Sequence, residues 1–187
     1  MPNYGLSDVN HIIDADEFNV LFNHCKNLTE KTWLLMLWLT GARPSELLEM
    51  VKKDVKIESD KVQFHVKTLK LKKSKQFMVT SRNLILNTSS IERYIKTLER
   101  HLSRLKDDSK IFQFSRKTGY NIIQKVGYEV TGKCLCPYNF RHSRMTLLAE
   151  KGASMEKLKM FKGSRSDSSV RPYLHIRKVS YDVEMDV

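Results

Sequence analysis

The sequence predicts a mainly α-helical protein that carries one small three-stranded antiparallel sheet. Two observations lead to this fold class. Apolar residues recur every three to four positions over most of the chain, as on the buried face of a helix, and they alternate only between residues 54 and 80. With 187 residues, 41% of them hydrophobic, the chain has the size and apolar content of one domain with its own core.

Three helices are expected before the sheet. Asp14 begins a capping-box-like pattern ahead of a helix over residues 15 to 26. Thr29 is expected to cap a second helix, which is apolar on all sides, must therefore lie in the core, and ends at Gly41. Pro44 then stands where a third helix would start, because proline is tolerated in the first helical turn.

Alternating apolar residues predict three short strands, carrying Val55 and Ile57, then Val62, Phe64 and Val66, then Phe77 and Val79. The lysine-rich stretch over residues 70 to 75 would form the hairpin between the last two. Helical patterns follow over residues 91 to 105, 116 to 130, 137 to 152 and 154 to 161. A polar loop over residues 163 to 169 then leads to a short helix or turn around Tyr173.

The charge balance points to a polyanionic partner. The chain has 33 Lys and Arg against 21 Asp and Glu, a net charge of +12. Nucleic acid is the leading candidate for a protein with such a surplus. The alternative is a basic helical protein whose charges only keep it soluble.

The cysteines and the hydropathy pattern exclude other classes. Cys25, Cys134 and Cys136 form neither a disulfide framework nor a zinc pattern with a second well-spaced pair, so structural roles in a reducing compartment and no metal are expected. No apolar run approaches the roughly 18 residues of a transmembrane helix, and no signal peptide opens the chain. The expected location is the cytoplasm of a prokaryotic cell or of the host cell of a virus.

Arg43 is the first candidate for a phosphate ligand. It lies in the run T-G-A-R-P-S-E-L, where Gly41 ends one helix and Pro44 begins another. A guanidinium at a helix N-terminus, beside free backbone N–H groups, is well placed to bind a phosphate. Glu46, three residues later, can orient or neutralise it. Taken alone, the run also fits a surface ion pair at a helix start.

A second arginine lies in the run Y-N-F-R-H, on the helix that begins at Pro137. Arg141 can bind a phosphate, and Tyr138 can donate a hydrogen bond to it or pack as an amphipathic ring. His142 is the more conventional group for moving a proton near neutral pH. Further along, Ser164 precedes Tyr173 by nine residues, and Pro172 places that tyrosine at a bend of the chain.

In order and spacing, these segments resemble the catalytic domain of the tyrosine recombinases, the phage-type and archaeal integrases. The resemblance covers about residues 12 to 178 and implies the tyrosine recombinase catalytic-domain fold. It also implies that Tyr173 is the nucleophile, with Tyr181 as the fallback. The catalytic residues it implies are Arg43, Lys70, Tyr138, Arg141, Ser164 and Tyr173.

Two of these positions depart from the family pattern. Tyr138 stands where the family most often has His, which puts general-base work by this residue in doubt, since a phenol has a pKa of about 10. Ser164 takes the place of a His or Trp and can still donate one hydrogen bond to a phosphate oxygen.

The family places a catalytic lysine in the hairpin, and two lysines compete for this role. The run from Lys70 to Val79 matches the family pattern without a gap, whereas Lys67 matches its K-T dipeptide but then needs a longer turn; Lys70 is therefore favoured. The other basic residues expected to contact DNA are Lys67, Lys72, Lys73, Lys75, His142, Arg144, Lys162 and Arg165.

The resemblance implies a site-specific DNA recombinase (integrase) of a mobile genetic element that acts through a 3′-phosphotyrosyl intermediate, without metal or nucleotide cofactor. Its partner would be double-stranded DNA, bound by a homodimer or homotetramer. We expect one catalytic domain over residues 1–187 without the family's N-terminal core-binding domain, as a fragment or a minimal form. The alternatives are a catalytically impaired DNA-binding accessory protein on the same fold and a type IB topoisomerase-like nicking-closing enzyme. Residues 177 to 187 could pack on a neighbouring subunit.

Overall fold

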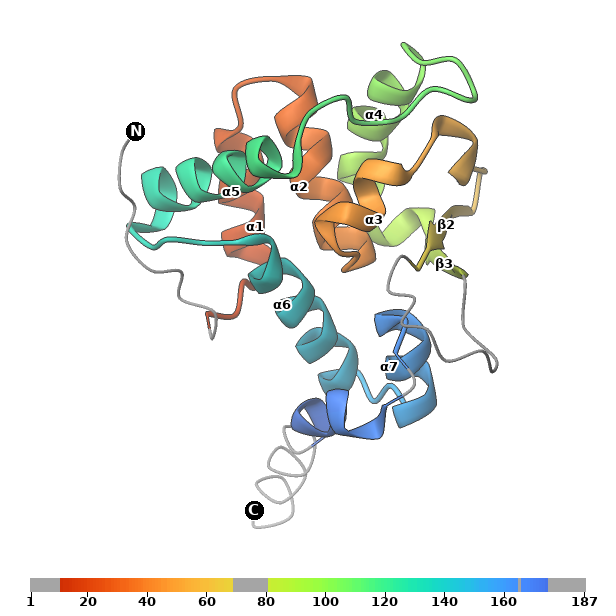
Figure 1. Cartoon of the computed structure of the whole chain (residues 1–187), viewed down its shortest axis with the longest axis vertical. Coiled ribbons are helices and arrows are strands. Elements are labelled where there is room, and N and C mark those ends of the chain that lie inside the picture. The colour runs from red at the N-terminus through yellow and green to blue at the C-terminus, as the bar shows by residue number, and fades with distance from the viewer. Residues whose placement is uncertain (1–10, 69–80, 165, 175–187) are drawn as a thin grey trace.

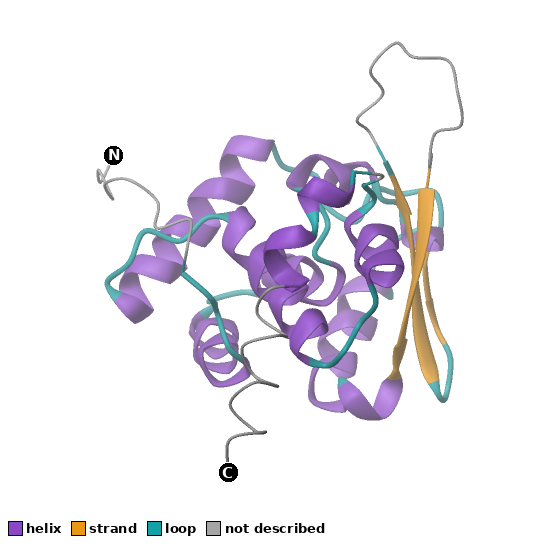
Figure 2. Cartoon of the chain, turned by 90° about the horizontal axis from the view of Figure 1, so that it is seen from below, coloured by secondary structure: helices purple, strands orange, loops and turns teal. Residues whose placement is uncertain are grey.

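The computed structural model describes residues 11–68, 81–164 and 166–174 (Figure 1). Helices dominate these residues, and three antiparallel strands form one sheet in the order β1-β2-β3. The sheet lies along one side of the helical body, as Figure 2 shows. The predicted fold class is therefore confirmed.

The elements follow the chain in the predicted order of helices, sheet, helices. Before the sheet come α1 (Ala15–His24), α2 (Leu28–Thr40), α3 (Pro44–Glu49) and the 3-10 turn η1 (Lys52–Asp54). The strands are β1 (Val55–Ile57), β2 (Lys61–Lys67) and β3 (Ser81–Asn87). After them come η2 (Thr88–Ser90), α4 (Glu92–Leu102), α5 (Arg116–Thr131), α6 (Pro137–Glu150), α7 (Met155–Lys162) and η3 (Asp167–Ser169).

Helix α2 runs through the core because it has no polar face. All of its residues from Thr32 to Thr40 are buried. Its N-cap is Asn27, whose side chain accepts from the backbone N–H of Glu30, so the prediction that Thr29 caps this helix is wrong. Gly41 ends the helix with φ 53°, the left-handed conformation that glycine adopts without strain.

The sheet turns one face to the helices. Val62, Phe64 and Val66 of β2 are buried, and Val66 pairs with Arg82 on β3. The strand next to β2 begins at Ser81, later than the expected strand at Phe77 and Val79, which lie outside the described residues. The prediction missed β3 because a charged residue, Arg82, takes an inward position and breaks the apolar alternation.

A second, smaller core lies near the C-terminal end of the described residues. It joins α6, α7 and the segment after η3 through Met145, Ala149, Leu158, Val170 and Tyr173. Figure 1 shows α6 extending from the helical body toward α7. Residues 171 to 174 are helical, which confirms the expected short helix around Tyr173. The predicted nucleophile is thus held by packing against α6 and α7.

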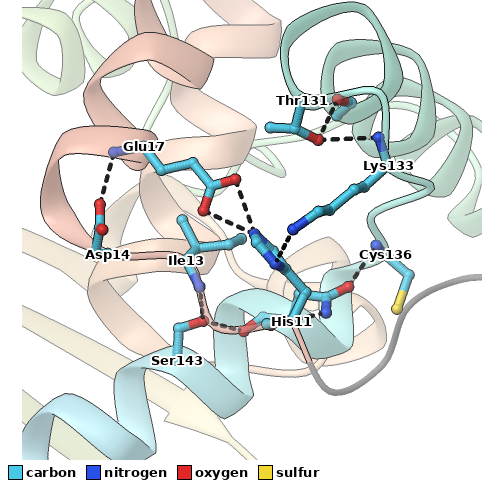
Figure 3. A network of polar contacts seen from close by, with 10 residues as sticks. His11, Ile13, Asp14, Glu17, Thr131, Lys133, Cys136 and Ser143 are labelled. Atoms are coloured by element: carbon cyan, nitrogen blue, oxygen red, sulfur yellow. Dashed lines mark hydrogen bonds and ion pairs between the residues drawn. The ribbon is translucent and has the colours of Figure 1, made fainter.

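Polar contacts fasten the start of the described chain to α6 (Figure 3). The backbone N–H of Ile13 donates to Ser143 Oγ at 2.7 Å, and the side chain of Asn139 donates to the carbonyl of His11 at 3.0 Å. The ring of His11 also contacts the carboxylate of Glu17 at 2.8 Å. Asn139 and Ser143 flank Arg141 and His142 in sequence, so these bonds fix the helix that carries two candidate site residues.

The three cysteines are free and buried, in agreement with structural roles. Burial raises the pKa of Cys25 to about 12, which keeps it an unreactive thiol at neutral pH. Over residues 11–68, 81–164 and 166–174, no helix has the length and apolar content to cross a membrane. Within the same ranges, no three His, Cys, Asp or Glu side chains gather as metal ligands would.

Candidate active site

Arg43 is the N-cap residue of α3 and is held in place by a buried carboxylate. Its Nη1 donates to Glu46 Oε1 at 2.8 Å, and its backbone N–H donates to Glu46 Oε2 at 2.9 Å. The Glu46 side chain is fully buried, whereas that of Arg43 is 28% exposed. The expected contact with Glu46 is present, and it leaves part of the guanidinium free to bind an anion.

Arg141 is the second guanidinium of the site, and it is almost entirely buried. Its Nη1 donates to the carbonyl of Gly41 at 2.6 Å, and its Nη2 donates to the carbonyl of Lys162. These carbonyls belong to the C-terminal ends of α2 and α7, where helices leave carbonyl groups without internal partners. Arg141 therefore connects three helices at one point.

The two arginines lie close enough to influence each other's charge. Burial lowers the pKa of Arg141 to about 10, and the positive charge of Arg43 contributes to this lowering. The guanidinium still carries its charge at neutral pH. Two cations held close together favour the binding of a dianion or of a phosphate that gains charge during a reaction.

Both arginines line a surface cavity of about 570 Å³. Its basic lining residues are Arg43, Arg116, Arg141 and Lys162. No acidic side chain of the described chain lines it. Tyr138 lines the same cavity and is half exposed. The cavity has the charge and the donors that a phosphodiester requires.

Three rings lie in a row from this cavity into the smaller core. The ring of Tyr138 stacks on that of His142, with centroids 5.8 Å apart, and His142 lies 5.3 Å from the ring of Tyr173. The Tyr173 hydroxyl is 3.0 Å from Nδ1 of His142. Lys162 Nζ lies 5.1 Å above the face of the Tyr173 ring.

Burial sets the protonation states in this row. It is the main cause that raises the pKa of Tyr173 above its ordinary value, and Tyr138 raises it further. Burial also lowers the pKa of His142, and the charge of Lys162 lowers it more. At neutral pH the phenol is therefore protonated and the imidazole neutral. A neutral imidazole with an unprotonated Nδ1 can accept the phenol's proton.

Other expected site residues lie around this centre. Ser164 accepts from Ser169 Oγ at 2.9 Å and lines, together with Arg144, a neighbouring cavity of about 710 Å³. Burial lowers the pKa of Arg144, which lies on α6. Lys67 is the exposed last residue of β2. The predicted residues Lys70, Lys72, Lys73, Lys75, Arg165 and Tyr181, with the tail, lie outside the described residues.

Of the two lysines that compete for the hairpin role, the structure describes only Lys67. Lys70 was favoured because its run led without a gap into a strand at Phe77 and Val79. Among the described residues, Lys67 ends β2 and pairs with Ser81, the first residue of β3. Lys70 and the rest of the expected hairpin up to Thr80 lie outside the described residues, so the choice between Lys67 and Lys70 stays a prediction.

Sequence reasoning missed two basic residues of the site. Arg116, the first residue of α5, lines the cavity with Arg43 and is an exposed arginine like many others in this chain. Arg82 is buried on β3 and donates from Nη2 to Glu46 Oε2 at 2.8 Å. The sequence signal for Arg82 is its spacing: it stands two residues before Leu84, so both side chains point to the same face of a strand.

Comparisons with known proteins agree with this geometry. The chain is 24% identical over 164 residues to "Tyrosine recombinase XerA" of Saccharolobus solfataricus, an alignment that covers 88% of this chain and 52% of that protein. It is 29% identical over 167 residues to the protein of the same name from Pyrococcus horikoshii, covering 88% and 56%. The chain spans about half the length of these curated relatives.

Solved structures show the same fold. A crystal structure of XerA recombinase superimposes with a TM-score of 0.71 at 18% identity, over 98% of this chain and 66% of that one. The catalytic domain of bacteriophage HP1 integrase superimposes with a TM-score of 0.55 at 17% identity, over 92% and 89%. The family model described as "Phage integrase family" matches residues 11–179, nearly the whole chain. This chain belongs to the phage integrase family, as a tyrosine recombinase catalytic domain.

Proposed function

We propose that this chain breaks and rejoins DNA strands site-specifically, with Tyr173 as the nucleophile. The observation that carries the proposal is the row from the basic cavity to Tyr173. Arg43 and Arg141 line the cavity, and the Tyr173 hydroxyl contacts a neutral imidazole beside it. This arrangement supplies an anion site, a nucleophile and a proton acceptor within one domain of the phage integrase family.

In the cleavage step, Tyr173 Oη attacks the phosphorus of a DNA phosphodiester. Its proton passes to Nδ1 of His142, 3.0 Å away, while the bond from phosphorus to the 5′-oxygen breaks. The products are a 3′-phosphotyrosyl bond and a 5′-hydroxyl. Attack by a 5′-hydroxyl of the same or another strand reverses the step, so the bond energy is kept in the intermediate.

The arginines would stabilise the charge that develops on the non-bridging oxygens in the five-coordinate state. Arg141 is suited to this because its position is fixed by two backbone carbonyls before any ligand binds. Arg43, held by Glu46, faces the same cavity. Tyr138 and Ser164 would donate further hydrogen bonds to the phosphate.

A lysine would protonate the leaving 5′-oxygen. We propose Lys67 for this role, with Lys70, which the sequence favours, as the alternative. Lys67 ends β2 directly before Thr68, whose hydroxyl lies 3.4 Å from Arg82 Nη1 at the edge of the site. Lysines 70, 72, 73 and 75 would contact the DNA backbone, where positive charge adds affinity without reading sequence.

The substrate we infer is double-stranded DNA, bound by two or four copies of the chain. The net charge of +12 and the basic cavity support this inference. Among proteins of similar fold, XerH recombinase was crystallised bound to its difH substrate. We place the reaction in the cytoplasm of a prokaryotic cell or of the host cell of a virus.

The test is relaxation of supercoiled plasmid in excess EDTA, followed by SDS gels for covalent protein–DNA adducts. Wild type, Tyr173→Phe and Tyr181→Phe are compared. We expect relaxation and an adduct with wild type and Tyr181→Phe, and neither with Tyr173→Phe. Activity that survives Tyr173→Phe but not Tyr181→Phe would assign the nucleophile to Tyr181. DNA binding without an adduct from any variant would favour the accessory-protein alternative.

A further inference from the structure

We propose that Arg82 is a positioning residue that holds Glu46, and through it the phosphate-binding Arg43, while linking the end of β2 to the site. The proposal rests on the function proposed above and names a residue that controls the geometry of the same site. Arg82 is not expected to touch the substrate. It acts through a carboxylate that has Arg43 on its other side.

Arg82 takes a position that an apolar residue would ordinarily occupy. It pairs in the sheet with the fully buried Val66, two residues before the buried Leu84. Its side chain is 4% exposed. A buried guanidinium needs a charged or polar partner, because burial of an unpaired charge is costly. The partner is Glu46, 36 residues away in sequence and itself fully buried.

The carboxylate of Glu46 divides its two oxygens between the two arginines. Oε1 accepts from Arg43 Nη1 at 2.8 Å, whereas Oε2 accepts from Arg82 Nη2 at 2.8 Å and from the backbone N–H of Arg43 at 2.9 Å. Burial alone would raise the pKa of Glu46, but hydrogen bonds from Arg82 and Arg43 outweigh burial and hold the pKa below its ordinary value. Arg82 thus keeps charged, and in one rotamer, the group that orients Arg43.

Arg82 also contacts the two segments on either side of the site. Its Nη1 lies 3.4 Å from Oγ1 of Thr68, and Thr68 directly follows Lys67. A Cβ placed on Gly163 would come within 2.8 Å of the same nitrogen, so the guanidinium packs directly against the backbone that precedes Ser164. A shift of the end of β2 or of that loop would therefore reach Glu46 and Arg43 through one side chain.

Stability alone does not account for this arrangement. Apolar side chains of similar volume are often as stabilising as a buried ion pair, because they avoid desolvation of two charges. In addition, Arg82 Nε is buried and has no hydrogen-bond partner among the described residues. Oε1 of the charged Glu46 accepts a hydrogen bond from Arg43, and Arg43 lines the cavity. Positioning of Arg43 explains why an arginine stands at this place.

The test measures single-turnover formation of the covalent adduct by wild type, Arg82→Lys, Arg82→Met, Arg43→Ala and Arg43→Ala/Arg82→Met. Arg104→Met, at an exposed site after α4, is the matched control. We expect Arg82→Met to slow cleavage roughly 10²-fold, the scale on which a misplaced catalytic group costs rate. DNA affinity should stay within about twofold of wild type, since Arg82 does not reach the substrate.

The double variant separates positioning from general damage. If Arg82 acts through Arg43, adding Arg82→Met to Arg43→Ala causes no further loss of rate. Arg82→Lys keeps the positive charge but loses the planar guanidinium with its several fixed donors. Its cleavage rate should therefore lie between those of Arg82→Met and wild type. The proposal would be overturned if the loss of cleavage rate in the double variant equalled the product of the two single losses, or if folded Arg82→Met cleaved at the wild-type rate. Loss of cleavage by the wild type itself would refute the proposed function instead.

A second measurement reports on Arg43 without any DNA chemistry. The Nε–Hε resonance of Arg43 in a ¹⁵N–¹H NMR spectrum, assigned with Arg43→Ala, senses how rigidly Glu46 holds the guanidinium. We expect it to shift and broaden in Arg82→Lys, and to stay unchanged in Arg104→Met. An Arg43 resonance identical in wild type and Arg82→Lys would overturn the proposal whether or not the chain cleaves DNA.

Discussion

The hydroxyl of Tyr173 lies 3.0 Å from Nδ1 of His142, which α6 carries, and the Tyr173 side chain is held by the smaller core around α6 and α7. This contact joins a phenol whose pKa burial raises to an imidazole whose pKa burial lowers. A protonated phenol therefore faces a neutral imidazole at neutral pH, and Nδ1 accepts from the phenol in the tautomer that carries its proton on Nε2. Under the proposed function, this arrangement would let the proton of Tyr173 pass to His142 during the attack.

His142→Asn is expected to separate hydrogen bonding from proton uptake. Asparagine can still accept a hydrogen bond from Tyr173, but it cannot take the proton at neutral pH. Cleavage should fall by about 10²-fold or more, the lower end of what a general base contributes. Adduct formation over time measures this. A wild-type rate for His142→Asn would show that the imidazole only holds the hydroxyl.

The pH dependence of cleavage should follow the lowered pKa of His142. Because the neutral form is the acceptor, the wild-type rate should persist as pH falls to the ordinary imidazole value of about 6.5 and should drop only below it. The same shift affects stability: the unfolded chain binds the proton more readily, so stability declines as pH falls through about 6.5. Single-turnover rates and urea unfolding, each measured from pH 5 to 8, check both statements.

Replacement of Arg141 should cost stability as well as activity. Arg141→Met leaves the buried carbonyl of Gly41 and the partly buried carbonyl of Lys162 without their donor, at an expected loss of roughly 2–4 kcal/mol. Arg144→Met, on the same helix, is the matched control. It should change stability by less than about 1 kcal/mol, because Arg144 Nε has no partner among the described residues. Urea unfolding curves give both values, and equal losses would contradict the anchoring role of Arg141.

Gly41 and Gly132 provide a matched pair for testing the packing behind Arg141. Both have positive φ, 53° and 68°, so alanine at either site should cost about 1 kcal/mol from backbone strain. At Gly41 the new Cβ would also lie 2.8 Å from Phe161, whereas at Gly132 it meets nothing within 4 Å. Gly41→Ala should therefore be further destabilised and should slow cleavage. Gly132→Ala should cleave DNA at the wild-type rate.

The choice between Lys67 and Lys70 can be made with a substrate whose leaving 5′-oxygen is replaced by sulfur. A thiolate leaves without protonation, so such a substrate no longer needs the general acid. We expect Lys67→Ala to cleave the normal substrate slowly and the sulfur substrate at nearly the wild-type rate. Lys70→Ala should treat both substrates alike. Rescue of Lys70→Ala instead would return the role to the residue that the sequence favoured.

Much of this fold follows from local sequence signals. Gly41 and Pro44 end and begin helices because of their own backbone preferences, so the place of Arg43 at a helix start could be predicted without a structure. The apolar face of α4 likewise reflects a period of 3.6 residues, whereas the unbroken apolar run of α2 is typical of a helix buried on all sides. The prediction was wrong at the cap of α2, where two capping residues stand two positions apart, and at β3.

By itself, the sequence determined the fold class and the family, and it indicated two arginines and a tyrosine as candidate site residues, because these inferences depend on residue type and local spacing. Only the tertiary structure decided which groups meet. Arg82 reaches Glu46 across 36 residues, and His142 reaches Tyr173 across 31. Such contacts arise from the register of β3 and the packing of α6 and α7. No local preference encodes them, since each depends on where the rest of the chain places its partner.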